Sequence, residues 1–206
     1  MRVDIWSDIV CPWCYIGKRR FEKALAGFER REEVRVVHRS FQLDPTMRKG
    51  QLFRHRDVLM RKYGMTEPQV AAAQARLVEV AASDGLEYHL SRTQTGNTLD
   101  AHRLVHLADE QGIQDAVIER FFRAHFTELR SLFDTESLVS LAEETGLDGA
   151  QELLGTDRYA ADVVADHREA NSLGARGVPF FVIGGRHSIE GAQATSVFAD
   201  TLRRSF

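Results

Sequence analysis

The sequence predicts a mixed α/β protein in which the two ends of the chain build one small sheet and a helical segment is inserted between them. Strand-like stretches lie near the N-terminus and near the C-terminus. The long middle of the chain carries apolar residues at helical spacing. Each end alone is too short to bury a core, so both ends are expected to share a sheet.

The N-terminal part predicts a strand, a helix and a second strand. Val3 to Ser7 alternates apolar and polar residues, which is typical of a short strand. The spacing predicts a helix from Pro12 to Glu29, with the proline accommodated in its first turn. Val34 to Phe41 is rich in β-branched residues and predicts the second strand.

The middle and the C-terminal part continue this pattern. Apolar periodicity and glycine stops predict helices over residues 51–63, 66–83, 98–111, 114–127, 135–144, 147–154 and 157–173. Strands at 178–183 and 187–190 flank the turn Gly184-Gly185, and a helix over 193–204 follows. The predicted division is a discontinuous domain of residues 1–45 and 156–206 with an all-helical insertion of residues 46–155.

Composition excludes several classes of protein. The formal net charge of −3 lacks the basic excess of a nucleic-acid binder. The first eight residues do not form a secretory leader, and no window approaches the ~18 apolar residues of a membrane helix. We therefore expect a cytoplasmic protein with no membrane or nucleic-acid partner. Two cysteines are too few for a disulfide-stapled scaffold or for a zinc site of four cysteines.

Those two cysteines, Cys11 and Cys14, are three positions apart where the first strand meets the first helix. A helix N-terminus favours an anion, so it stabilises the thiolate that attacks disulfides. Cys14 follows one turn later, close enough to attack a mixed disulfide formed on Cys11. Pro12 stiffens the turn between them.

Two alternatives stay open at this point. The cysteines could be inert core residues. They could also bind a metal ion together with histidines or with a second chain. The spacing of His102 and His106 would place both histidines on one helix face. We expect no metal, because the second half of a zinc site is missing.

A second motif is Gly177-Val178-Pro179-Phe180-Phe181-Val182. Together with Cys-Pro-Trp-Cys-Tyr-Ile-Gly-Lys after the first strand, it makes the chain resemble the DsbA-like branch of the thioredoxin superfamily, and within it the FrnE-type subgroup. The resemblance covers essentially the whole chain. Supporting matches are Asn97-Thr98 with Ala101-His102, Phe126-Thr127-Glu128, and Ile189 to Gln193.

The resemblance implies a thioredoxin fold with a large helical insertion, and thiol–disulfide exchange as the activity. It makes Cys11 the attacking cysteine, Cys14 the resolving cysteine and Pro179 a cis-proline. The remaining residues it assigns to shaping the site or binding substrate are Pro12, Trp13, Val178, Asn97 and Thr98. It implies no tightly bound cofactor, only a redox-active Cys11–Cys14 disulfide.

The resemblance also bears on partners. The expected substrate is a disulfide-containing protein or a low-molecular-weight thiol, with glutathione as a candidate co-substrate. The expected protein is a monomer or a homodimer. Periplasmic DsbA has a histidine where this chain has Trp13, so a weaker oxidant of the reductase or isomerase type is expected. Kappa-class glutathione transferases and 2-hydroxychromene-2-carboxylate isomerases share the fold and give the alternative function, but they typically have a serine at the position of Cys11.

Overall fold

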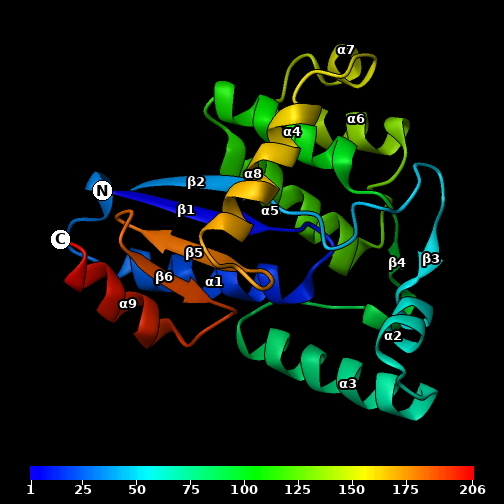
Figure 1. Cartoon of the computed structure of the whole chain (residues 1–206), viewed down its shortest axis with the longest axis horizontal. Coiled ribbons are helices and arrows are strands. Elements are labelled where there is room, and N and C mark those ends of the chain that lie inside the picture. Colours follow the sequence, from blue (N-terminus) through cyan, green and yellow to red (C-terminus); the bar gives the residue numbers. More distant parts are fainter.

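A four-stranded sheet forms the centre of the computed structural model, which describes residues 1–206. The sheet contains β1 (Arg2–Ser7), β2 (Arg35–Ser40), β5 (Phe180–Ile183) and β6 (His187–Glu190) in the order β2-β1-β5-β6. Strand β1 pairs in parallel with β2 and antiparallel with β5, and β5 pairs antiparallel with β6. Both ends of the chain therefore contribute to one sheet, as the sequence predicted (Figure 1).

Helices cover both faces of this sheet. Helices α1 (Pro12–Ala26) and α9 (Thr195–Arg204) pack on one face, and α8 (Ala160–Ser172) lies on the other (Figure 1). Successive strand residues point to opposite faces. Val3 and Ile5 of β1 thus pack toward α1 and α9, while Trp6 joins Ala170 of α8 on the opposite side.

Between β2 and α8 the chain forms the helical insertion. Its helices are α2 (His55–Tyr63), α3 (Glu67–Ser83), α4 (Leu99–Glu110), α5 (Gln114–Arg123), α6 (Thr135–Glu143) and α7 (Ala150–Leu154). A π-helical turn, Ala124–Glu128, follows α5, and short 3₁₀ turns occur at Arg31–Glu33 and Leu90–Arg92. No helix combines the length and the apolar character needed to cross a membrane.

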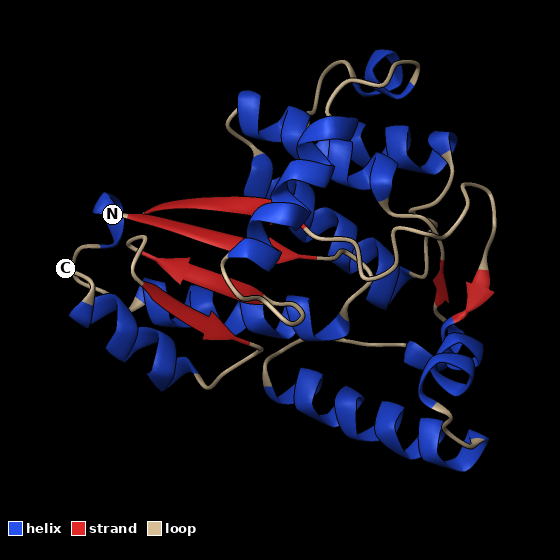
Figure 2. Ribbon diagram, viewed as in Figure 1, coloured by secondary structure: helices blue, strands red, loops and turns tan.

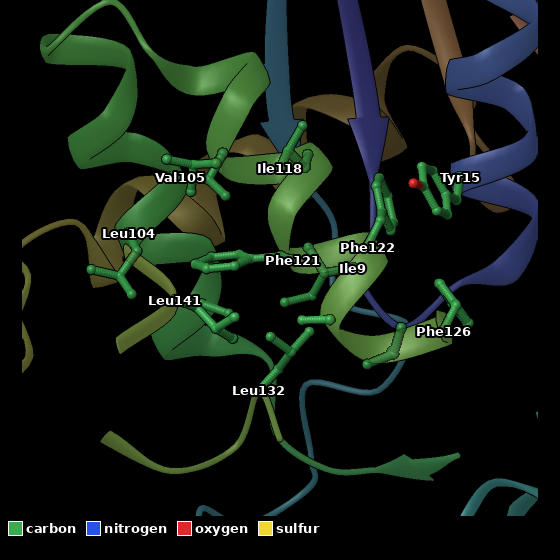
Figure 3. Close-up of a cluster of buried hydrophobic side chains, with 14 of the residues drawn as sticks. Ile9, Tyr15, Leu104, Val105, Ile118, Phe121, Phe122, Phe126, Leu132 and Leu141 are labelled. Atoms are coloured by element: carbon green, nitrogen blue, oxygen red, sulfur yellow. The ribbon is translucent and has the colours of Figure 1, made fainter. Parts of the chain in front are cut away.

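The largest hydrophobic core joins this insertion to the start of α1. Its 28 buried residues include Phe121, Phe122 and Phe126 from the insertion, and Ile9 and Tyr15 from the N-terminal part (Figure 3). The insertion therefore packs directly around the segment that carries the two cysteines. The division into residues 1–45, 46–155 and 156–206 stays a prediction.

Side chains from the insertion and from α8 protect the edge of the sheet formed by β2. The Gln114 side chain accepts a hydrogen bond from the His38 backbone N–H at 2.8 Å and donates to the His38 carbonyl at 2.9 Å. Asp166 of α8 accepts from the Ser40 N–H at 2.9 Å. These side chains take the place of a further strand, which reduces the risk of edge-to-edge association.

Several predicted boundaries were wrong. The insertion is not all-helical, because β3 (Phe53–Arg54) and β4 (Gln94–Thr95) form a two-stranded ladder that stands apart from the main sheet (Figure 2). Helix α2 consequently starts at His55 rather than at residue 51. Helix α1 ends at Ala26, with Gly27 as its C-cap, rather than at Glu29. Thr66, where the predicted helix over residues 66–83 begins, is the N-cap of α3 and forms a capping box with Gln69.

Candidate active site

The two cysteines lie at the start of α1, directly after β1. Cys11 is the N-cap residue of the helix, with extended backbone angles of φ −90° and ψ 112°. Its N–H donates to the Asp8 carbonyl, and the Cys14 N–H donates to the Cys11 carbonyl, each at 3.0 Å. Pro12 is the first helical residue, where no intrahelical donor is lost. This local structure follows from a strand that ends just before a proline-initiated helix.

The thiols have different surroundings. Both are free, with Cys11 at 5% exposure on the wall of a groove and Cys14 at 0% behind it. Burial raises the pKa of the Cys14 thiol, and the neighbouring Cys11 raises it further. Cys14 therefore keeps its proton, whereas Cys11 occupies the N-cap position of α1 beside the groove.

The second motif meets the first across this site. The Cys11 Sγ lies 3.7 Å from the Val178 carbonyl oxygen. The Val178–Pro179 peptide bond is cis. Pro179 is buried, and its own carbonyl accepts a hydrogen bond from the Gly191 N–H at 2.8 Å. Two motifs that are far apart in the sequence are thus in contact.

Gly17 makes this contact possible. A Cβ atom at this position would lie 2.8 Å from Cγ of Pro179 and 3.4 Å from Cζ of Phe181. Helix α1 therefore has no space for a side chain where it crosses the Pro179 segment. Gly17 belongs to the Cys-Pro-Trp-Cys-Tyr-Ile-Gly-Lys motif, but nothing in the local sequence indicates this close approach to Pro179.

A buried polar pair lies beneath the dithiol. Asp8 and His102 are each 1% exposed, and Nε2 of His102 is 3.4 Å from Oδ1 of Asp8. The other carboxylate oxygen of Asp8 accepts a hydrogen bond from the Leu43 N–H at 2.8 Å. The negative charge of Asp8 adds to the burial that raises the pKa of Cys14. Sequence reasoning missed Asp8, although its place three residues before Cys11 was a usable signal.

Tyr88 is another residue that the sequence did not single out. Its hydroxyl donates to the Pro12 carbonyl at 2.7 Å, so a residue from the insertion fixes the backbone between the cysteines. Burial raises the pKa of the Tyr88 phenol, which keeps it protonated as a donor. The tyrosine ring stacks on Phe126 of the main core.

The groove beside Cys11 has a volume of about 1050 Å³. The sheet side contributes Cys11, Pro12, Trp13 and Val178, and α2 and α3 contribute the facing wall. Trp13 is 43% exposed at the rim, although it is a large apolar residue. Such exposed apolar surface around a groove is typical of a binding site.

Asn97 and Thr98 lie beside this groove rather than on its wall. The Asn97 side chain donates to the Met47 carbonyl at 2.6 Å and accepts from the Leu99 N–H at 2.9 Å, so it secures the loop before α4. Thr98 is buried, and its hydroxyl accepts from the side chain of Gln42, a groove residue, at 3.4 Å. Direct contact of Asn97 and Thr98 with substrate stays a prediction.

The histidines considered as metal ligands contact separate carboxylates. His102 faces Asp8, whereas Nε2 of His106 is 3.1 Å from Asp166 and 3.2 Å from the Ser40 hydroxyl. The hydroxyl and the carboxylate share one ring nitrogen of His106, so these residues do not form a nucleophile triad, which uses both nitrogens. No group of three side chains of the metal-binding types comes together.

Comparison with known proteins identifies the family. A family model described as a DSBA-like thioredoxin domain matches residues 2–203. The chain belongs to this family. The fold of this DSBA-like chain, a thioredoxin-type sheet with a helical insertion, is therefore confirmed.

Individual proteins are similar to this DSBA-like chain over nearly its whole length. The probable DsbA oxidoreductase SCO1869 from Streptomyces coelicolor is 47% identical with a TM-score of 0.95, over 100% of this chain and 89% of that one. The uncharacterized protein YwbO of Bacillus subtilis (strain 168) is 31% identical over 206 residues, which is 96% of this chain and 94% of YwbO. A 2-hydroxychromene-2-carboxylate isomerase is 14% identical with a TM-score of 0.69, over 99% and 95% of the two chains, and shares the fold alone.

Proposed function

We propose that this DSBA-like protein is a thiol–disulfide oxidoreductase that acts through Cys11 and Cys14. The arrangement of the dithiol carries the proposal. Cys11 caps a helix N-terminus at the wall of a groove, and Cys14 is fully buried one turn behind it. An accessible nucleophile backed by a protonated, resolving thiol is the arrangement that two successive thiol–disulfide exchanges require.

The reaction runs in two steps. The Cys11 thiolate attacks one sulfur of a substrate disulfide, a Cys11–substrate disulfide forms, and the other substrate sulfur leaves as a thiolate that takes up a proton. Cys14 then loses its proton and attacks the Cys11 sulfur. The second substrate thiolate leaves and the Cys11–Cys14 disulfide forms. The substrate gains two electrons, and the protein loses two.

A thiol must reduce the protein disulfide before the next turnover. A low-molecular-weight thiol such as glutathione can do this, since two equivalents return both cysteines to thiols and become a disulfide. Periplasmic DsbA has a histidine at the position of Trp13, and we take this difference to favour reductase or isomerase chemistry over strong oxidation. We propose a disulfide-containing protein or a low-molecular-weight thiol as the partner.

The experiment is a disulfide-reduction assay with dithiothreitol as the electron donor. Cys11→Ser is expected to abolish turnover above the background of dithiothreitol. In a single turnover without dithiothreitol, which would itself cleave the mixed disulfide, Cys14→Ser is expected to stop after the first step, so that a covalent substrate adduct accumulates on Cys11 and is detected by mass spectrometry. If both variants keep wild-type turnover, the proposal is wrong.

The alternative, a glutathione-linked isomerase or transferase, rests on the shared fold. That chemistry needs no second thiol. An isomerase would therefore retain its activity in Cys14→Ser and form no Cys11–Cys14 disulfide during turnover. The two readouts together distinguish the functions, because only the oxidoreductase couples turnover to oxidation of both cysteines.

A further inference from the structure

The groove beside Cys11 has an unusual charge composition. Asp and Glu make up 30 of the 206 residues, so 22 residues drawn at random would include about three, yet none of the 22 residues that line the groove is acidic. Three of them, Lys62, Arg76 and Arg176, are cationic. A chain with a net charge of −3 therefore presents a positive groove next to its nucleophile.

The cations come from three separate elements. Lys62 is near the end of α2, Arg76 lies on α3, and Arg176 precedes the Val178–Pro179 segment. Lys62 contacts only the Leu43 carbonyl, at 3.5 Å, and the ring of the adjacent Tyr63, and Arg76 forms no ion pair or hydrogen bond. Neither side chain is held in an ion pair with an acidic residue, so both can approach a ligand in the groove.

Acidic groups lie next to the groove but not on its lining, and they leave Arg76 without an ion-pair partner. Glu190 lies 3.3 Å from the Arg176 guanidinium, but both side chains are exposed, and exposed pairs are weak. Asp44 accepts hydrogen bonds from Thr46 and keeps its negative charge, and it lines an adjoining pocket together with Lys62, so it offsets part of the Lys62 charge. Asp8 is buried below the groove against His102.

The groove is larger than a small thiol would fill, and part of its lining is apolar. Its volume of about 1050 Å³ lies just above the ~300–1,000 Å³ of small-molecule sites. Trp13, Leu43 and Tyr63 are exposed large apolar side chains on its lining. Burial lowers the pKa of the two histidines in the lining, His55 and His167, so both are neutral at pH 7 and add surface rather than charge.

We propose that the groove receives an extended polypeptide segment in which acidic side chains flank the disulfide-bonded cysteine. This inference rests on the proposed function and names its substrate class. Apolar contacts with the rim hold the segment, and the unpaired cations select its charge. Complementary charge raises association rates, and this effect weakens as salt screens it.

The test uses three peptide disulfides that are identical except for the residues next to cysteine, which are Glu, Gln or Lys. The rate constant for reaction with the reduced wild-type protein is measured by stopped flow. We expect the Glu peptide to react about 3- to 10-fold faster than the Lys peptide at low salt, from two or more weak charge pairs. The difference is expected to shrink strongly at ~1 M salt, where the screening length is ~3 Å.

A double variant tests whether Lys62 and Arg76 cause the preference for acidic peptides. Lys62→Glu with Arg76→Glu is expected to reverse the order of the Glu and Lys peptides. The matched control, Arg35→Glu with Arg186→Glu, makes the same change in net charge at two exposed arginines outside the groove, so it is expected to keep the wild-type order. A reversal in both double variants would mean that overall charge, not the groove, sets the preference.

The remaining outcomes separate this inference from the proposed function. If all three peptides react at one rate, the groove inference is wrong while disulfide exchange stands. If oxidised glutathione reacts faster than every peptide and the groove variant slows it, the anionic ligand is a small disulfide and the polypeptide assignment is wrong. If no disulfide reacts, the proposed function itself fails.

Discussion

Replacing Gly17 by alanine tests how closely α1 must approach Pro179. The added Cβ would lie 2.8 Å from Cγ of Pro179 and 3.4 Å from Cζ of Phe181. Pro179 is buried and its side chain is a rigid ring, and Phe181 is 0% exposed. Neither side chain can therefore adopt another rotamer to avoid the new Cβ atom. Helix α1 or the Pro179 segment must move by several tenths of an ångström, which changes the geometry between Cys11 and Val178.

Two opposing contributions determine how much Gly17→Ala changes the free energy of unfolding. Overpacking of a dense core costs about 1–3 kcal/mol. Alanine in a helix interior gains about 1 kcal/mol over glycine. Because the clash involves a proline ring and a packed phenylalanine, we expect the overpacking cost to be in the upper half of its range. The net loss in the free energy of unfolding is then about 1–2 kcal/mol.

The assay is urea unfolding together with the disulfide-reduction rate. The matched control is Gly27→Ala, where the nearest atom to an added Cβ is 3.8 Å away and no clash arises. We expect Gly27→Ala to leave stability and rate close to wild type, and Gly17→Ala to lower both. A Gly17→Ala protein that unfolds at the wild-type urea concentration and reduces disulfides at the wild-type rate would refute the reasoning.

Three further predictions concern buried titratable side chains. Lys18→Met removes an ammonium group that is 3% exposed and lies 3.0 Å from the half-buried Glu119. The free energy of unfolding, measured by urea denaturation, should fall by less than the about 3–5 kcal/mol that is lost when a fully buried pair is broken. An unchanged midpoint of unfolding would contradict this. Asp8→Asn removes a charge that raises the pKa of Cys14. The pH at which Cys14 resolves a mixed disulfide at half its maximal rate should therefore fall. If this pH rises instead, Asp8 acts as the acceptor of the Cys14 proton. Burial lowers the pKa of His125 to about 3, so the unfolded chain binds this proton first and wild-type stability should fall as pH drops from ~6.5 toward 3. His125→Leu should flatten that fall in a pH series of denaturation curves, and equal slopes would argue against it.

The parts of the fold that local sequence could predict are those with a local cause. Val3 to Ser7 alternates with period two, and β1 forms there. Thr66 carries the chemistry of an N-cap, and α3 begins beside it, with the Thr66 N–H donating to Gln69 at 2.8 Å. The position of Cys11 and Cys14 between the first strand and the first turn of the first helix was also predictable, because it depends on local spacing; their role as a redox dithiol stays a prediction.

The parts that local sequence could not predict depend on distant contacts. β3 and β4 are two residues each, too short for any periodicity, and they pair across some 40 residues. The contact of Tyr88 with Pro12 and that of His102 with Asp8 join the insertion to the first helix and strand. Neither partner carries a local signal for the other, so these residues emerge only from the packing of the insertion.

The central claim is that Cys11 and Cys14 form one redox couple, and the redox equilibrium with glutathione tests it most directly. The protein is equilibrated over a range of reduced-to-oxidised glutathione ratios, its free thiols are alkylated, and the products are weighed by mass spectrometry. We predict one transition in which both thiols disappear together into an intramolecular disulfide, at a potential more reducing than the about −120 mV of DsbA. Two free thiols at every ratio, or glutathione bound to Cys11 without closure by Cys14, would contradict the account.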